Sequence, residues 1–173
     1  MKSTPNNKNK YDSSIELAKH LRDKGNIDEA IKEYNRAAEW AVKKESYLLE
    51  MQAHNLLASL YWSREDLSET LYQYGKVIGI GRECDIRHTK EYTEAIYHIV
   101  VILTRIQPPP PQLFTLAKEL VDVRCEMVND KNDKDFQDYK LILDTLNKVY
   151  KRRHRLRKPR KYTFMKIIGV VNE

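Results

Sequence analysis

A chain of 173 residues is long enough to bury the core of one domain. Its composition, 41% hydrophobic and 32% charged with only five Gly, favours a soluble and mostly helical protein. The formal net charge of +6 is concentrated in residues 151–161, which hold eight Lys or Arg and no acid, so that 23 basic and 25 acidic residues remain elsewhere. This nearly neutral body argues against a protein that binds nucleic acid over its whole surface.

The sequence gives no support to a membrane-spanning, secreted or disulfide-stabilised protein. No apolar run approaches the roughly 20 residues of a membrane span. The N-terminus lacks the apolar segment of a secretory signal. Cys84 and Cys125 are isolated thiols, as expected in the reducing cytosol or nucleus. We therefore expect a cytoplasmic protein.

The chain opens with a polar stretch, residues 1–11, which has no hydrophobic period and is predicted to be a disordered arm. A first helix is predicted to begin near Ser13, where Glu16 stands three residues later as in a capping box, and to end before Gly25.

The first turn and second helix follow directly. Gly25 suits the left-handed residue that ends a helix, and Asn26 with Glu29 suits a capping box that opens the next. The second helix is predicted from about Ile27 to Lys43, with small and large apolar residues on one face.

The same order of small and large side chains recurs after 40 residues. The predicted packing positions are Leu17, Ala18, Leu21, Gly25, Ala30, Tyr34 and Ala37 in the first copy, and Leu57, Ala58, Tyr61, Thr70 and Tyr74 in the second. Paired helices with this pattern are typical of tetratricopeptide (TPR) repeats, whose usual period is about 34 residues. The longer period predicts longer helices.

The second helix pair is predicted from the same signals. A third helix should span about Ser46 to Ser63, and a fourth should open at Asp66 with Glu69 completing a capping box. The glycines of the fourth helix weaken it, so we expect it to fray near Gly81.

A connector, residues 82–89, separates the second pair from a fifth helix that Thr89 is placed to cap. Residues 95–103 are apolar on nearly every side, which predicts a helix buried between neighbours. His98 is interpreted as a hydrogen-bonded histidine of the core or its rim, with a ligand as the alternative.

Four prolines, residues 108–111, are predicted to end the fifth helix, and Pro111 suits the first turn of a sixth. A polar loop, residues 129–135, precedes a seventh helix. The seventh helix carries apolar residues at heptad spacing and is expected to cap the array or to offer a face to a partner. These residues are Phe136, Tyr139, Leu143, Leu146 and Tyr150.

These elements predict an all-α fold in which TPR-like antiparallel helix pairs stack as a short α-solenoid of about seven helices. The predicted organisation is a disordered arm at 1–11, a helical domain at 12–150, and a tail at 151–173 that is first basic and then apolar.

The tail contains the one strongly charged stretch of the chain. Such runs bind nucleic acid, anionic membranes or an import receptor, and they also occur as solvated helix ends; these alternatives stay open. Nuclear localisation is therefore a second expectation. The residues offered to an anionic partner are Lys151, Arg152, Arg153, Arg155, Arg157, Lys158, Arg160 and Lys161.

No catalytic constellation is visible in the sequence. Cys84 and His88 are four residues apart, but two ligands do not make a zinc site. The motifs of phosphate-binding loops, dinucleotide-binding folds and zinc proteases are absent. We therefore expect a non-enzymatic protein with no cofactor, metal or small-molecule substrate, whose partner is another protein.

Three stretches resemble the family of huntingtin-associated TPR-like proteins. They are LRDKGNIDEAIKEYNRAAEW at 21–40, the Arg64–Asp66 turn at its spacing after residues 36–38, and an apolar helix broken by prolines, ILTRIQPPPP, at 102–111. The chain departs from the family in its short connector, its smaller number of repeats and its basic tail.

This resemblance implies an adaptor that packs against the helical-repeat scaffold of huntingtin. It also implies a link to early endosomes and vesicle transport through a small Rab GTPase. Two alternatives stand beside it: an adaptor of SNARE complexes, which uses similar long helix pairs, and a binder of RNA or anionic membranes through the tail.

Overall fold

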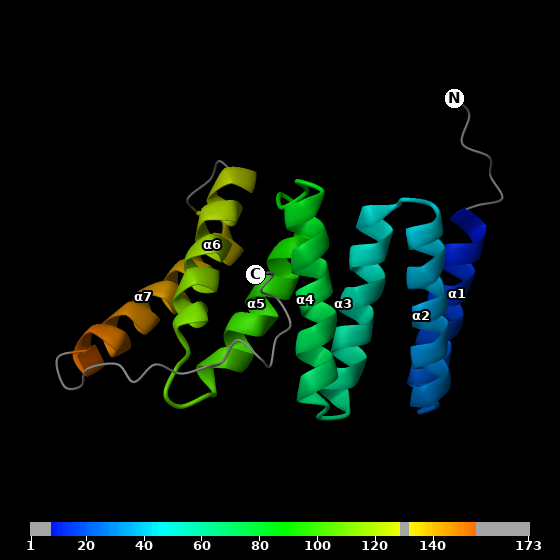
Figure 1. Cartoon of the computed structure of the whole chain (residues 1–173), viewed down its shortest axis with the longest axis horizontal. Coiled ribbons are helices and arrows are strands. Elements are labelled where there is room, and N and C mark those ends of the chain that lie inside the picture. The colour runs from blue at the N-terminus through cyan, green and yellow to red at the C-terminus, as the bar shows by residue number, and fades with distance from the viewer. Residues whose placement is uncertain (1–7, 129–131, 155–173) are drawn as a thin grey trace. The chain divides into compact units, whose positions relative to one another are not determined.

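The computed structural model describes residues 8–128 and 132–154, and every regular element in these ranges is an α-helix. The helices are α1 Lys8–Asp23, α2 Ile27–Lys43, α3 Tyr47–Ser63, α4 Leu67–Glu83, α5 Lys90–Thr104, α6 Pro111–Met127 and α7 Lys134–His154 (Figure 1). The chain divides into two compact units, Met1–Asp85 with α1 to α4 (unit 1) and Ile86–Glu173 with α5 to α7 (unit 2). The division falls inside the predicted helical domain 12–150.

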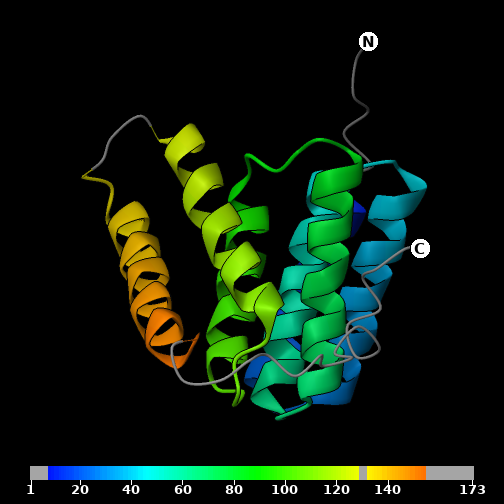
Figure 2. The same ribbon diagram turned by 60° about the vertical axis from the view of Figure 1, so that its left-hand side comes forward.

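Successive helices pack against each other within each unit: α1 on α2, α2 on α3 and α3 on α4 in unit 1, and α5 on α6 and α6 on α7 in unit 2. Both Figure 1 and Figure 2 show α1 to α4 as antiparallel neighbours joined by short turns. The predicted all-α, helical-repeat fold class is confirmed.

Unit 1 has a shorter period than the one read from the sequence. The helices α2, α3 and α4 each have 17 residues, and each begins 20 positions after the last. The residues with positive φ recur at the same interval: Gly25 (81°), Glu45 (52°), Glu65 (61°) and Asp85 (53°). The 40-residue repeat is therefore two 20-residue helix-and-turn steps.

The first three turns share one hydrogen-bond pattern. In each turn, a backbone N–H reaches the carbonyl five residues earlier, which is the Schellman bond that ends a helix on a left-handed residue. These bonds are Asn26 N–H to Leu21 O, Ser46 N–H to Ala41 O and Asp66 N–H to Tyr61 O, at 2.9, 2.9 and 3.0 Å. Glu45 and Glu65 adopt the conformation that glycine adopts at position 25.

The first helix begins earlier than predicted. It starts at Lys8 rather than Ser13, so the predicted boundary of the arm at residue 11 is wrong by four residues. The ring of Tyr11 is only 4% exposed and lies 6.0 Å from that of Trp40, and its hydroxyl donates to the carbonyl of Leu49 at 2.9 Å. These contacts stabilise the first helical turn. Residues 1–7 lie outside the described ranges.

The helix caps agree with the sequence at two of four positions. The side chain of Asp66 accepts from Glu69 N–H at 3.1 Å, and that of Thr89 accepts from Tyr92 N–H at 3.4 Å. Asn26 makes no side-chain cap bond, so that prediction is wrong. The cap predicted at Ser13 is also wrong, because this residue lies inside α1.

In unit 2, α5 is buried along most of its length, as predicted for its apolar run. The chain leaves α5 through the prolines, and Pro111 occupies the first turn of α6 as expected. The ring of Tyr97 on α5 lies 5.5 Å from that of Tyr139 on α7, so all three helices meet. Helix α7 begins at Lys134 and ends at His154, beyond the predicted domain boundary at 150.

Candidate protein-interaction surface

The predicted packing residues form the interior of unit 1 rather than a site. Eight of them are buried: Ala18, Ala30, Tyr34, Ala37, Leu57, Ala58, Thr70 and Tyr74. Leu21 and Tyr61 are half-buried, and Gly25 lies exposed in its turn.

Leu17 departs from its predicted packing role, because its side chain is 46% exposed whereas Leu57, its equivalent 40 residues later, is fully buried. The physical reason is position in the stack. Helix α3 packs between α2 and α4, whereas α1 packs mainly against α2. An end helix has fewer neighbours to cover its apolar residues.

Exposed apolar side chains gather where α2 turns into α3, at residues 42–48, the α2–α3 corner. Val42 is 53% exposed, Tyr47 45% and Leu48 43%. The turn lies at the upper end of unit 1 in Figure 1. Single exposed apolar residues are ordinary on a protein surface, but these three lie within seven residues of one turn, and we call them the apolar patch.

The α2–α3 corner rests on a fixed support. Its backbone is held by the bonds from Glu45 N–H to Val42 O at 3.0 Å and from Ser46 N–H to Ala41 O at 2.9 Å. In addition, the hydroxyl of Tyr11 on α1 donates a hydrogen bond to the carbonyl of Leu49, the residue next to the patch. A backbone that is already ordered loses less conformational entropy when a partner binds.

The charged side chains of this corner make no ion pair with other described residues. Lys43, Lys44 and Glu45 are exposed. The structure shows no ion pair for any of the three within the described residues. The side chain of Ser46 caps no backbone group. The corner therefore keeps two lysines available beside the apolar patch.

The equivalent α3–α4 corner, residues 62–68, lies one period later at the opposite end of the helices (Figure 1). It also exposes apolar side chains, Trp62 at 39% and Leu67 at 42%. Its charges, however, are used in the fold: Arg64 Nη1 lies 2.5 Å from Asp28 Oδ1, and the Asp66 carboxylate caps α4.

A buried polar pair joins α3 to α4. His54 is 5% exposed and its Nδ1 lies 2.7 Å from Gln73 Oε1, while its Nε2 lies 3.9 Å from the Glu50 carboxylate. Burial lowers the pKa of His54 to about 4, although the bond to Gln73 opposes the shift. Burial raises the pKa of Glu50, and the nearby Lys76 opposes this. His54 is therefore a neutral structural residue at neutral pH.

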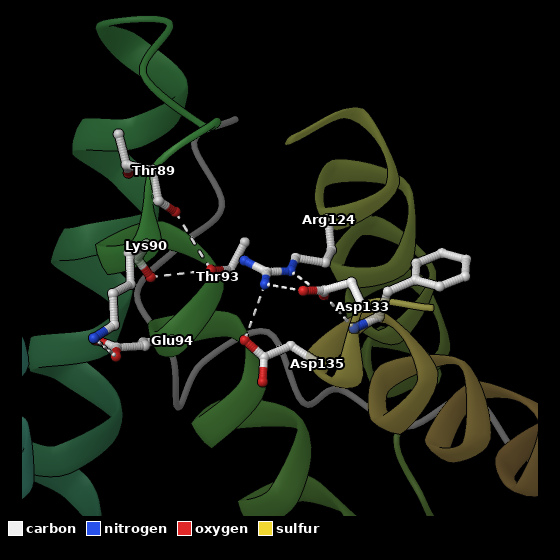
Figure 3. A network of polar contacts seen from close by, with 8 residues as sticks. Thr89, Lys90, Thr93, Glu94, Arg124, Asp133 and Asp135 are labelled. Carbon is white, nitrogen blue, oxygen red and sulfur yellow. Dashed lines mark hydrogen bonds and ion pairs between the residues drawn. The ribbon is translucent and has the colours of Figure 1, made fainter. Parts of the chain in front are cut away.

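Unit 2 contains a network that ties the end of α6 to the start of α7 (Figure 3). Arg124 donates to both carboxylate oxygens of Asp133 at 2.7 and 2.8 Å and lies 3.1 Å from Asp135. Asp133 also accepts from Phe136 N–H at 2.9 Å and so caps α7. The hydrogen bonds from Arg124 are the main cause that lowers the pKa of Asp133, and the bond from Phe136 N–H lowers it further. The network stabilises a helix connection.

The remaining predicted candidates do not form a site in the structure. Cys84 and Cys125 are free thiols, and no group of three potential metal-binding side chains occurs among the described residues. His98 is exposed, and its ring packs edge-on against Tyr97, as expected for a residue of the rim. None of the described helices is both long and apolar enough to cross a membrane.

The basic run falls largely outside what the structure describes. Its first residues continue the backbone of α7, without described side chains: Lys151, Arg152 and Arg153. The others lie outside the described ranges: Arg155, Arg157, Lys158, Arg160 and Lys161.

Sequence reasoning missed the α2–α3 corner and the His54–Gln73 pair. The sequence held no local signal for the corner, because Val42, Tyr47 and Leu48 are apolar residues of predicted helices. Comparison with known proteins adds no identity, since no family model, curated protein or solved structure matches the chain.

Proposed function

We propose that this protein is a non-enzymatic adaptor that binds a partner protein through the α2–α3 corner. The observation that carries the proposal is the set of three exposed apolar side chains, Val42, Tyr47 and Leu48, on a rigid and otherwise polar turn. A few apolar or aromatic side chains at the centre of an interface commonly contribute most of the binding free energy.

The partner must cover more than this patch. Stable interfaces bury roughly 800 Å² on each side, which is several times what three half-exposed side chains provide. The neighbouring helix ends of unit 1 supply further surface. A helical-repeat partner, which presents rows of exposed helices, fits such a broad and ridged surface.

The resemblance of residues 21–40, 64–66 and 102–111 to huntingtin-associated proteins supports a huntingtin-like scaffold as that partner. In this proposal the adaptor acts in the cytoplasm at early endosomes, with a Rab GTPase as a further partner. A SNARE assembly is the alternative scaffold for the same corner.

Affinity purification of the full chain tests the proposal. The triple variant Val42→Ser, Tyr47→Ser, Leu48→Ser should lose its co-purifying scaffold protein while keeping its helical circular dichroism. Leu17→Ser with Tyr72→Ser is the matched control, because these residues are 46% and 52% exposed outside the corner. Equal recovery of the scaffold by the triple variant would contradict the proposal.

A second comparison separates the tail from the helical units. Removal of residues 151–173 should leave the scaffold protein bound. If the truncated chain no longer binds any partner, the basic run is the binding element and the corner is not. If RNA or anionic vesicles bind the full chain but not the truncated chain, and if this binding weakens strongly as salt is added, they are ligands of the tail.

A further inference from the structure

Resting on the proposed docking role of the α2–α3 corner, we infer that its partner presents an acidic segment, with Asp or Glu beside large apolar side chains. The apolar residues of that segment would cover Val42, Tyr47 and Leu48, and its carboxylates would pair with the two lysines between Val42 and Tyr47.

These two lysines lie within the corner itself. Lys43 and Lys44 stand between Val42 and Tyr47 in the turn, are exposed, and have no ion pair within the described residues. Their ammonium groups therefore keep their full capacity to pair with a carboxylate at an interface, where partial desolvation strengthens the attraction. Two lysines without an ion pair in the described residues, Lys43 and Lys44, therefore lie in the turn among three exposed apolar side chains.

This charge is a property of the corner and not of the repeat. At the equivalent positions of the α3–α4 corner stand Ser63 and Arg64, and Arg64 is paired with Asp28. That corner also carries Glu65 and Asp66. Burial is the main cause that raises the pKa of the neighbouring Tyr61, and the Glu69 and Asp66 carboxylates raise it further. Two turns with one backbone therefore present opposite charge.

An acidic protein segment fits better than an anionic membrane. Residues 1–85 hold 13 Lys or Arg and 14 Asp or Glu, so unit 1 as a whole is nearly neutral and offers a negatively charged bilayer no net attraction. A single segment meets only the charges within about 10 Å of it, because salt screens the rest. Within residues 42–48, the two lysines outnumber the one acid, Glu45.

The test measures binding of two fluorescent helical peptides to the full chain by anisotropy. Both carry leucines along one face, and the flanking positions are Glu in one peptide and Lys in the other. We expect the Glu peptide to bind the full chain more tightly. The double variant Lys43→Glu, Lys44→Glu should weaken its binding by about tenfold in low salt.

The control is Lys24→Glu with Lys32→Glu, which makes the same charge change at exposed lysines outside the corner and should weaken binding less than twofold. Equal losses in the two double variants, no loss in either, or preference for the Lys peptide would overturn the inference. Vesicles of phosphatidylcholine and phosphatidylserine that bind the chain and release the Lys43, Lys44 variant would overturn it in favour of lipid.

The apolar triple variant separates the two proposals. If it loses its co-purifying scaffold protein while the Lys43→Glu, Lys44→Glu variant keeps both the scaffold and the Glu peptide, the corner is a docking site whose partner is not acidic. If neither variant loses the scaffold or the Glu peptide, the docking role itself is wrong.

Discussion

The α2–α3 corner and the α3–α4 corner lie one 20-residue step apart and share the left-handed residue, the Schellman bond and an exposed apolar side chain on each flank. They differ in their polar side chains. At the second corner, Arg64 forms an ion pair with Asp28, and the Asp66 side chain caps the first turn of α4. At the first corner, Lys44 forms no ion pair and Ser46 makes no side-chain cap bond within the described residues.

The difference separates the two tasks of a repeat. The backbone of a turn is fixed by helix geometry and recurs, whereas polar side chains on the turn are free to serve either the fold or a partner. A turn whose side chains stabilise the fold should be sensitive in stability, and a turn whose side chains are unengaged should be sensitive in binding. The following variants test that division.

The largest expected effect tests the repeat on which the comparison rests. Leu57→Ala removes a fully buried side chain and should lower the free energy of unfolding by roughly 2–5 kcal/mol. Leu17→Ala changes a half-exposed side chain and should stay within about 0.5 kcal/mol. Urea unfolding followed by circular dichroism measures both, and similar losses would contradict the assigned positions in the stack.

Acid should weaken the second helix pair through His54. Its pKa is about 4 in the folded chain, below the 6.5 of an exposed histidine, so the unfolded chain takes up the proton first. The free energy of unfolding should therefore fall between pH 6.5 and 4, by up to about 3 kcal/mol. The raised pKa of Glu50 acts with the opposite sign and makes the fall smaller.

The variant His54→Gln isolates this contribution, since it keeps a polar side chain opposite Gln73 and removes the titration. Its free energy of unfolding should depend less on pH over that range than that of the unmodified chain. Unchanged pH dependence would show that His54 is not held neutral by burial.

The helix caps compare the two corners directly. Asp66→Ala should lower the free energy of unfolding by about 1 kcal/mol, because it removes the bond to Glu69 N–H. Ser46→Ala should leave it nearly unchanged, because Ser46 makes no side-chain cap bond. Thermal or urea unfolding gives the two values, and equal losses would mean that the first corner also depends on its side chains.

The smallest effect tests the shared backbone. Glu45→Gly and Glu65→Gly should each raise the free energy of unfolding by about 0.5 kcal/mol, because glycine avoids the strain of positive φ but loses more entropy on folding. Thermal or urea unfolding measures the two changes in the free energy of unfolding, and these should agree within error. A clear difference between them would show that the two turns are not equivalent.

Most of the architecture could be predicted from the sequence, because helix periodicity, the small residues Ala18 and Ala58, and the caps at Asp66 and Thr89 are local signals. The 20-residue step was hidden, since the turn residue is Gly only at position 25 and an acid at the later turns. The helix pattern alone could not reveal that these turns are equivalent.

The candidate site was out of reach for another reason. Exposure depends on which neighbours a helix has, as the buried Leu57 and exposed Leu17 show, and no local pattern reports this. Val42, Tyr47 and Leu48 are apolar residues of two good helices, so the sequence alone suggests that they are buried. Only the packed structure places them outside the core.

Photo-crosslinking tests the central claim most directly. Benzoylphenylalanine in place of Tyr47 within the corner, or of Tyr72 outside it, marks two aromatic positions of similar exposure, 45% and 52%. After irradiation in cells, the chain with the probe at position 47 should be joined to one protein species, and the chain with the probe at position 72 should not. No crosslink at position 47, or the same crosslink at both positions, would contradict the account.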